Sequence, residues 1–378
     1  MENRINIFAD VSSFLTLLDN DEFKNGKNLK CLIRQRSDIF LMIEEEDLEN
    51  RWNDIENPFR KSCDAYDIPC PHALPELNRI FKSPELCYQL DPMGIWMMND
   101  ATDDDINKFR EYFGVWMVNT STLKDDGFYL HHKREYEKDD VIEGDSMNGW
   151  KNYISELASQ NIEIPPINAI VLNDRYLIYS AKEEYAEQSI KWGLDNLRCL
   201  LDALLPKNLK IPFHLTISCR HPSLDVAKTD TIVSQFRKEV QCLRNYKIVV
   251  EFVYLNYSKH KRTFHSNYFL FDLDRGYNAF YAKAPNKLIG ENAFSLESYF
   301  NDPYCSGDTN FITAKNKIMT IKKDCDDVFT SPDTSSSDQS LFKRCDLPLP
   351  EKIQNRLFYE CNEKNLLHII RYSFSCFL

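Results

Sequence analysis

Short runs of hydrophobic residues alternate with amphipathic helical patterns in the first part of the chain. The stretch INIFADVSSFLTLL predicts a strand that ends at Asp10 and is followed by a helix. DIFLMI, GIWMMND and YFGVWMV are further runs of strand length, and DEFKNGKNLKCLIRQR predicts another helix. In DATDDDINKFREYFG we expect a helix that starts with a capping box of Thr102 and Asp105 and ends at Gly114. Together these elements predict an α/β domain.

Strand and helix patterns also alternate in the second part of the chain. The strand pattern INAIVL is followed by the helix pattern EEYAEQSIKWGLDNLRCLLDALLP, the strand KIPFHLTIS and the helix TDTIVSQFRKEVQCLRNY. Two further strands are predicted at KIVVEFVYLN and HSNYFLFDL. This alternation predicts a mostly parallel sheet that is covered by helices.

The length of 378 residues and the uneven distribution of charge both indicate two domains. Residues 1–150 contain 31 acidic and 17 basic side chains, whereas residues 151–378 contain 27 and 29. Pro165 and Pro166 mark the boundary. We therefore predict an acidic α/β domain at 1–164, a second α/β domain at 165–310, and a C-terminal extension at 311–378. The extension has a helical tail and a mobile Ser/Asp-rich loop at 331–340.

The stretch SKHKRTFHSNYFLFDLDRGYNAFYAK concentrates cations and aromatic residues in an otherwise acidic chain. Cations that neutralise phosphates, next to rings that stack on bases, are typical of surfaces that bind single-stranded nucleic acid. The alternation in NYFLFDL also fits a half-buried strand, in which several of the rings would point into the core. The candidate ligand-binding residues are Lys259, His260, Lys261, Arg262, Asn267 and Arg275.

The order of elements over residues 166–300 resembles the phospholipase-D-like fold, especially its degenerate form at the C-terminus of microtubule-interacting-and-trafficking-domain proteins. The resemblance implies a mixed sheet flanked by helices. Active members carry His-x-Lys and, after four intervening residues, Asp, at positions that are occupied here by His260, Arg262 and Asn267. His260 would be the nucleophile and Arg262 would hold phosphate, but Asn267 cannot act as a carboxylate. No second copy is visible, although a homodimer could supply one, so binding is favoured over hydrolysis. His265 is a possible substitute nucleophile, but a histidine on a strand is more often structural.

The N-terminal carboxylates support an alternative function as a metal-dependent nuclease. Asp10, Glu45, Asp100 and Asp104 could converge at strand ends and hold Mg²⁺ or Mn²⁺. The opening INIFADVSSFLTLL also resembles the first strand and helix of PIN-domain ribonucleases, in which the aspartate binds metal. Capping alone would also explain the run TDDD. Asp10 is thus a second catalytic candidate, and without this activity we expect no cofactor.

Other classes lack a visible motif, because the chain has no GxGxxG, GxxxxGK[ST] or GxSxG. No apolar run is long enough to cross a bilayer, so we expect a cytoplasmic protein without membrane insertion. Nucleic acid and a protein partner or homodimer are the expected partners, in bacterial stress response or phage defence. A component of protein assemblies that binds only protein is the other alternative.

Overall fold

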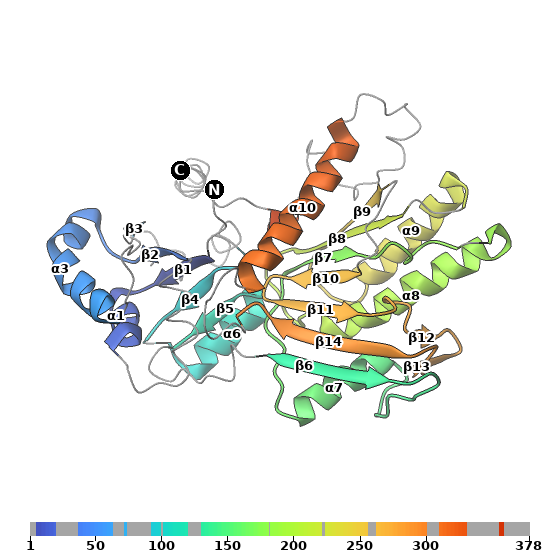
Figure 1. The fold of residues 1–378 in the computed structure, drawn as a ribbon, viewed down its shortest axis with the longest axis horizontal. Coiled ribbons are helices and arrows are strands. Elements are labelled where there is room, and N and C mark those ends of the chain that lie inside the picture. Colours follow the sequence, from blue (N-terminus) through green and yellow to red (C-terminus); the bar gives the residue numbers. More distant parts are fainter. Residues whose placement is uncertain are drawn as a thin grey trace.

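The computed structural model describes residues 5–19, 37–62, 72–73, 92–99, 101–119, 130–180, 182–220, 224–255, 262–300, 310–330 and 355–358. Within these residues the protein has a mixed α/β fold with two larger sheets that lie side by side (Figure 1). The predicted fold class, two α/β units, is confirmed. None of the described helices has both the length and the apolar character that a membrane crossing requires.

The N-terminal sheet is parallel and has the strand order β3-β2-β1-β4-β5. Its elements are β1 (Ile5–Ala9), α1 (Val11–Asp19), β2 (Ser37–Leu41), α3 (Glu45–Ser62), β3 (His72–Ala73), β4 (Ile95–Met97), α6 (Asp103–Phe113) and β5 (Trp116–Val118). Helix α6 starts and ends as predicted, with the Thr102–Asp105 capping box and a left-handed Gly114. The predicted helix over residues 21–36 lies outside the described residues.

The second sheet is mixed, with the order β6-β14-β11-β10-β7-β8-β9. Its strands are β6 (His131–Tyr136), β7 (Ala169–Asn173), β8 (Phe213–Arg220), β9 (Ile248–Leu255), β10 (Thr263–Ser266), β11 (Phe269–Leu273) and β14 (Asn292–Ser298). Strands β7, β8 and β9 are parallel, as predicted, whereas β10, β11, β14 and β6 pair in antiparallel fashion, so the prediction of a mostly parallel sheet is wrong. A small hairpin of β12 (Phe280–Tyr281) and β13 (Ala284–Leu288) lies outside this sheet.

Two features of the second sheet differ from the sequence-based prediction. HSNYFLFDL forms two antiparallel strands, because the chain turns at Asn267 and Tyr268. Strand β6 comes before Pro165 but pairs with β14, so the predicted boundary at residue 164 does not separate the two sheets. Periodicity does not show this pairing, because it joins strands that are far apart in sequence.

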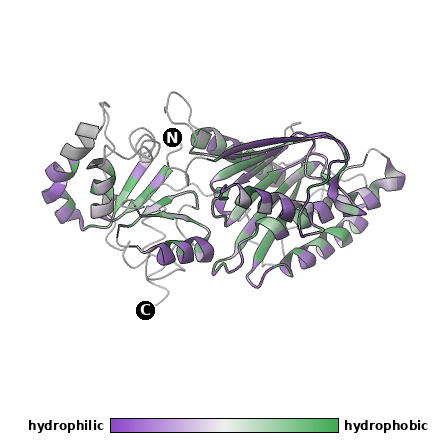
Figure 2. Ribbon diagram, turned by 90° about the horizontal axis from the view of Figure 1, so that it is seen from below, coloured by the Kyte–Doolittle hydropathy of each residue, from purple (hydrophilic) through white to green (hydrophobic). Residues whose placement is uncertain are grey.

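Helices cover both faces of the second sheet. They are α7 (Gly149–Ser159), α8 (Ala186–Leu204), α9 (Val226–Gln241) and α10 (Asn310–Thr330), with short 3₁₀ turns η2 (Glu183–Tyr185) and η3 (Arg356–Phe358). One face of β8 packs into the same core as α7, α8 and α9, and the opposite face of the sheet packs with α10. Figure 2 shows hydrophobic residues on many of the strands and both hydrophilic and hydrophobic residues along the helices. The predicted loop at 331–340 lies outside the described residues, and only η3 of the tail beyond it is described.

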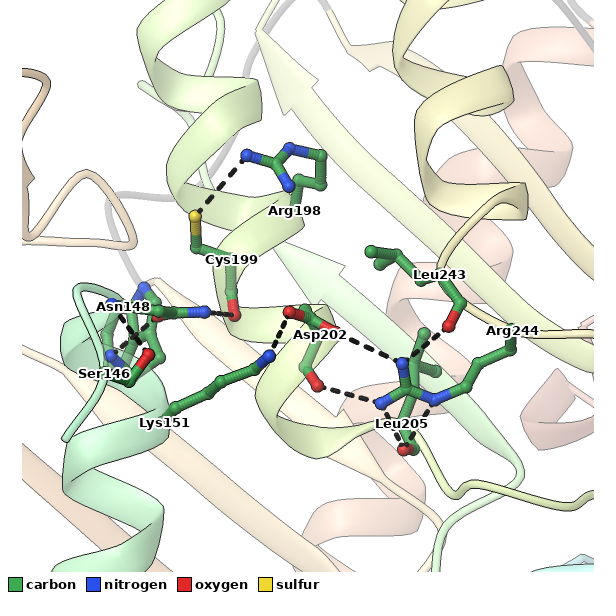
Figure 3. A network of polar contacts seen from close by, with 10 residues as sticks. Ser146, Asn148, Lys151, Arg198, Cys199, Asp202, Leu205, Leu243 and Arg244 are labelled. Atoms are coloured by element: carbon green, nitrogen blue, oxygen red, sulfur yellow. Dashed lines mark hydrogen bonds and ion pairs between the residues drawn. The ribbon is translucent and has the colours of Figure 1, made fainter.

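A polar network fixes the C-terminal end of α8 against its neighbours (Figure 3). Lys151 on α7 forms an ion pair of 2.5 Å with Asp202, and the guanidinium of Arg244 pairs with the same carboxylate at 3.2 Å. Arg244 also donates hydrogen bonds of 2.8 Å to the carbonyls of Asp202 and Leu205. These carbonyls lack partners within the helix, so Arg244 acts as a C-terminal cap.

The turn between β10 and β11 joins the two sheets. The Asn267 amide donates to the carbonyls of Pro92 and Gly114, and its oxygen accepts from the backbone N–H of Asn168. The buried Tyr268 hydroxyl donates to the carbonyl of Gly94 at 2.7 Å and accepts from the backbone N–H of Trp116 at 2.8 Å. Gly94 and Trp116 lie at the start of β4 and β5, and Asn168 immediately precedes β7. The sheets therefore meet at their amino-terminal edges.

We expect Tyr268→Phe to lower the free energy of unfolding by about 2 kcal/mol, because two buried backbone groups lose their partner. Tyr281→Phe is the matched control, since the Tyr281 hydroxyl makes only an exposed hydrogen bond to Asp139. That variant should change stability by less than about 0.5 kcal/mol. Urea denaturation measures both, and equal losses would contradict the role of Tyr268.

Candidate nucleic-acid interface

Cations and tyrosine rings gather where β7 and β8 end and where β10 begins. We call this group the carboxyl-edge cluster; it consists of Arg175, Tyr176, Tyr179, Lys182, Tyr185, Arg220 and Arg262. Strand β8 ends at Arg220, residues 175–185 connect β7 to α8, and Arg262 immediately precedes β10. Because β10 is antiparallel to β7, its first residue lies at the carboxyl end of β7. Ligands of α/β sheets commonly bind at this edge.

Each tyrosine of the cluster has a cation close to its ring. The Arg262 and Arg175 guanidinium carbons lie 5.2 and 5.4 Å from the centroid of Tyr176. Arg220 lies 4.3 Å from the ring of Tyr179. The Lys182 ammonium lies 5.9 Å from the ring of Tyr185. These distances are those of cation–π contacts, which hold cations and rings at fixed positions relative to each other.

Two rings of the cluster lie close to each other, and the third is exposed at the surface. The centroids of Tyr176 and Tyr179 are 6.1 Å apart, with the ring planes tilted by 57°. Both residues are half-buried, whereas Tyr185 is 53% exposed. The cluster therefore offers aromatic surface to a ligand.

The buried carboxylate of Asp174 bonds to residues of the cluster. The Asp174 carboxylate accepts hydrogen bonds from the backbone N–H of Tyr176 at 2.9 Å and of Tyr277 at 3.2 Å. It also forms an ion pair of 3.7 Å with the Nε of Arg262. Burial raises the pKa of the Asp174 carboxyl, and the two N–H groups and Arg262 oppose part of this rise. Asp174 therefore positions Arg262 and does not itself reach solvent.

Glycine is required next to this pair. Gly276 has φ +87°, and a Cβ there would lie 2.7 Å from an Asp174 oxygen and 2.8 Å from Arg262 Cδ. The Arg262 guanidinium also donates a hydrogen bond of 2.7 Å to the carbonyl of Asp274. Arg262 is thus held by two neighbouring segments, with 21% of its side chain exposed.

The predicted ligand-binding residues lie in different parts of the structure. Arg262 belongs to the carboxyl-edge cluster, whereas Lys259, His260 and Lys261 lie outside the described residues. Arg275 follows the segment that Arg262 contacts, but its exposed side chain pairs with Glu291 at 3.6 Å. Asn267 is fully buried at the opposite edge of the sheet, and the prediction that it binds ligand is wrong. Its amide is used in joining the two sheets.

Most rings of the stretch 258–283 are also in the interior. The buried ones are Phe264, Tyr268, Phe269, Phe271, Tyr277 and Phe280. Strand β11 shows the alternation that NYFLFDL predicts, with Phe269 and Phe271 buried and the residue between them only half-buried. The rings that reach the surface come instead from DRYLIYSAKEEY, residues 174–185. The signal in the sequence was a series of cations and tyrosines directly after a hydrophobic strand.

His265 has a structural environment. It is 1% exposed, and its Nδ1 lies 3.0 Å from the Tyr299 hydroxyl. Burial, with a smaller effect of Lys317, lowers the pKa of His265 to about 3. The ring is therefore neutral and enclosed at pH 7, which does not suit a nucleophile that must reach a substrate.

The predicted metal ligands are only partly described. Asp10 caps α1: one carboxylate oxygen accepts from the backbone N–H of Ser13 at 2.7 Å, and the other from the Ser13 hydroxyl and the backbone N–H of Asn99. Glu45 is exposed at the start of α3, and Asp104 pairs with Lys108 on α6. Asp100 lies outside the described residues. Among the residues that are described, no three histidine, cysteine, aspartate or glutamate side chains form a group that could hold a metal ion.

Comparison with known proteins gives no family assignment. No protein-family model matches the chain, and no curated protein sequence matches it significantly. Inference about function therefore depends on the geometry of the carboxyl-edge cluster.

Asp10→Ala should lower the free energy of unfolding by about 0.5–2 kcal/mol, because α1 loses its N-terminal cap. Asp10→Asn should lower the free energy of unfolding much less, since an amide oxygen can also accept the hydrogen bond from the Ser13 N–H. Chemical denaturation compares the two variants. If Asn destabilises the protein as much as Ala, the negative charge and not the cap is what matters at Asp10.

His265 should make stability depend on pH in a defined direction. Its folded pKa lies below the unfolded value of about 6.5, so the stabilisation is complete above pH 6.5 and is lost as the pH falls toward 3. Relative to His265→Gln, the wild type should lose about 1.4 kcal/mol of unfolding free energy per pH unit below about 6.5. Urea denaturation from pH 7.5 to 5 measures this difference. A constant difference between the two proteins would contradict a neutral buried His265.

Proposed function

We propose that the protein binds single-stranded nucleic acid at the carboxyl-edge cluster. The observation that carries the proposal is that three tyrosines at one edge of the sheet each have a cation on the ring. Single-strand binding surfaces combine cations that follow the phosphates with rings that stack on the bases. Both chemical components are present within residues 174–185 and their two neighbours, Arg220 and Arg262.

The arginines are suited to phosphate. A guanidinium presents several N–H donors in one plane and can bind two oxygens of a phosphate at once. Among the described residues Arg220 lies on the ring of Tyr179 and has no acidic partner, so we propose that its charge serves a ligand. The ion pair with Asp174 already orients the Arg262 side chain. This side chain therefore loses less conformational entropy when a ligand binds.

The tyrosines are suited to bases. A ring has two faces, and the guanidinium of Arg220 covers one face of Tyr179. Stacking of a base on an aromatic side chain contributes about 1–3 kcal/mol and depends little on the base. The cluster is therefore suited to a strand of any sequence.

The proposal agrees with a degenerate phospholipase-D-like module that binds phosphate without hydrolysing it. Arg262 occupies the position that holds phosphate in the active members which the sequence resembles. The carboxylate position is occupied by Asn267, which faces the domain junction. We therefore propose binding as the function of this module.

The two alternatives have less support. For a metal-dependent nuclease, the Asp10 carboxylate would have to exchange three intramolecular hydrogen bonds for metal contacts. A protein that uses its surfaces only for protein contacts would not need cations placed on exposed rings. Its association would also weaken little with salt if the interface were apolar.

Titration of fluorescent single strands against the protein at several salt concentrations tests the proposal. Arg220→Gln should weaken binding and reduce the slope of log K against log salt by about 0.7, because one phosphate contact is lost. Tyr179→Ala should weaken binding by about 1–3 kcal/mol through the loss of stacking. Lys108→Gln, on α6 of the N-terminal sheet, is the control and should leave binding unchanged. Equal affinities of all four proteins would contradict the proposal.

A further inference from the structure

The surface next to the carboxyl-edge cluster on the side of β11, β14 and β6 is acidic. We call it the acidic flank; its exposed carboxylates are Glu137, Asp139, Asp140, Glu143, Asp145, Asp274 and Glu291. Strands β11 and β6 run parallel to β7, since two antiparallel pairings separate β7 from β11 and two more separate β11 from β6. The segments after β11 and β6 therefore leave the sheet at the same edge as residues 174–185.

The cations on this side do not compensate the carboxylates. Those described are Lys138, Arg275, Lys283 and Lys287, four against the seven acids of the flank. Two of the four are paired within the flank, Arg275 with Glu291 at 3.6 Å and Lys287 with Asp139 at 3.2 Å. Residues 174–185 with Arg220 and Arg262 contain four cations and three acids, so the net charge along the edge changes from positive to negative directly after Arg262, whose guanidinium donates to the carbonyl of Asp274.

This change of sign limits the path of a bound strand. A strand that lies on Tyr185, Tyr179 and Tyr176 reaches Arg175 and Arg262 at the end of the cluster. Further phosphates would then lie against the acidic flank, where like charges repel. A strand that stops at Arg262 avoids this repulsion.

We infer that the carboxyl-edge cluster receives the end of a strand and prefers an end that carries a phosphate monoester. The inference rests on the proposed function and adds the class of ligand. A phosphate monoester carries about −1.5 to −2 charges at pH 7 and has three acceptor oxygens, whereas each phosphodiester within a strand carries one charge. Arg175 and Arg262 lie on the same ring, that of Tyr176, so two positive charges meet at the end of the cluster where such a group would lie.

The test compares single strands of one sequence that differ only at their ends. The probes are a strand with a 5′-phosphate, one with a 3′-phosphate, one with hydroxyls at both ends, and a closed circle. We expect one of the phosphorylated strands to bind about tenfold more tightly than the strand without terminal phosphate. The circle should bind most weakly, and the tighter of the two phosphorylated strands identifies the end that is recognised.

Two variants test the roles of Arg262 and of the acidic flank. Arg262→Lys keeps the charge but removes the planar pair of donors, so it should reduce the preference for the phosphorylated end while binding persists. Asp274→Asn removes one charge of the acidic flank, and we expect it to strengthen binding of the circle more than binding of the phosphorylated strand. Lys108→Gln again serves as the control, and circular dichroism shows whether each variant is folded.

The outcomes distinguish this inference from the proposed function. Equal affinities for all four probes, with a loss on Arg220→Gln, would overturn the inference and leave nucleic-acid binding in place. Absence of binding to every probe would overturn both. A preference for a phosphorylated end that persists in Arg262→Lys and is the same in Asp274→Asn would overturn the assignment of that end to Arg262 and the acidic flank.

Discussion

Hydrogen bonds from the turn at Asn267 and Tyr268 hold the two sheets together. The turn is buried, and its side chains bond to the backbone of residues at the start of β4, β5 and β7. Buried backbone groups at strand ends need partners, and here side chains of the second sheet supply partners for the backbone of the N-terminal sheet. Gly114 allows this contact, because a Cβ there would lie 2.2 Å from the carbonyl oxygen of Ile167. The relative position of the sheets therefore follows from a few residues that exclude water and satisfy one another.

This junction determines how the carboxyl-terminal edges of the two sheets are placed. The sheets meet at their amino-terminal edges, so their carboxyl-terminal edges point away from each other (Figure 1). Ligand sites of α/β sheets lie at the carboxyl edges. Asp10 follows the end of β1, and Arg262 lies beside the end of β7. The two residues consequently lie on opposite sides of the molecule. Within one copy of the protein these two side chains are therefore not placed to act on the same atoms of a ligand.

Local patterns in the sequence predicted those parts of the fold that local interactions determine. The α6 capping box and the run of β7, α8, β8, α9 and β9 follow from periodicity and from end signals. Pairing between distant segments could not be predicted: β6 joins β14 across more than 150 residues, and HSNYFLFDL turns because Asn267 and Tyr268 bond to the N-terminal sheet. The same turn separates two predicted ligand residues, since Arg262 and Asn267 are at opposite ends of β10 and only Arg262 lies at the carboxyl end of β7. Cations and rings in sequence order do not show which of them face solvent.

The central claim is that single-stranded nucleic acid lies on the tyrosines that follow β7. Photocrosslinking measures this contact directly, because irradiation joins a base to the ring on which it stacks. After digestion, mass spectrometry identifies the peptide that carries the nucleotide. The account predicts crosslinks at Tyr176, Tyr179 or Tyr185. Crosslinks confined to the N-terminal sheet, with none in residues 174–185, would contradict it.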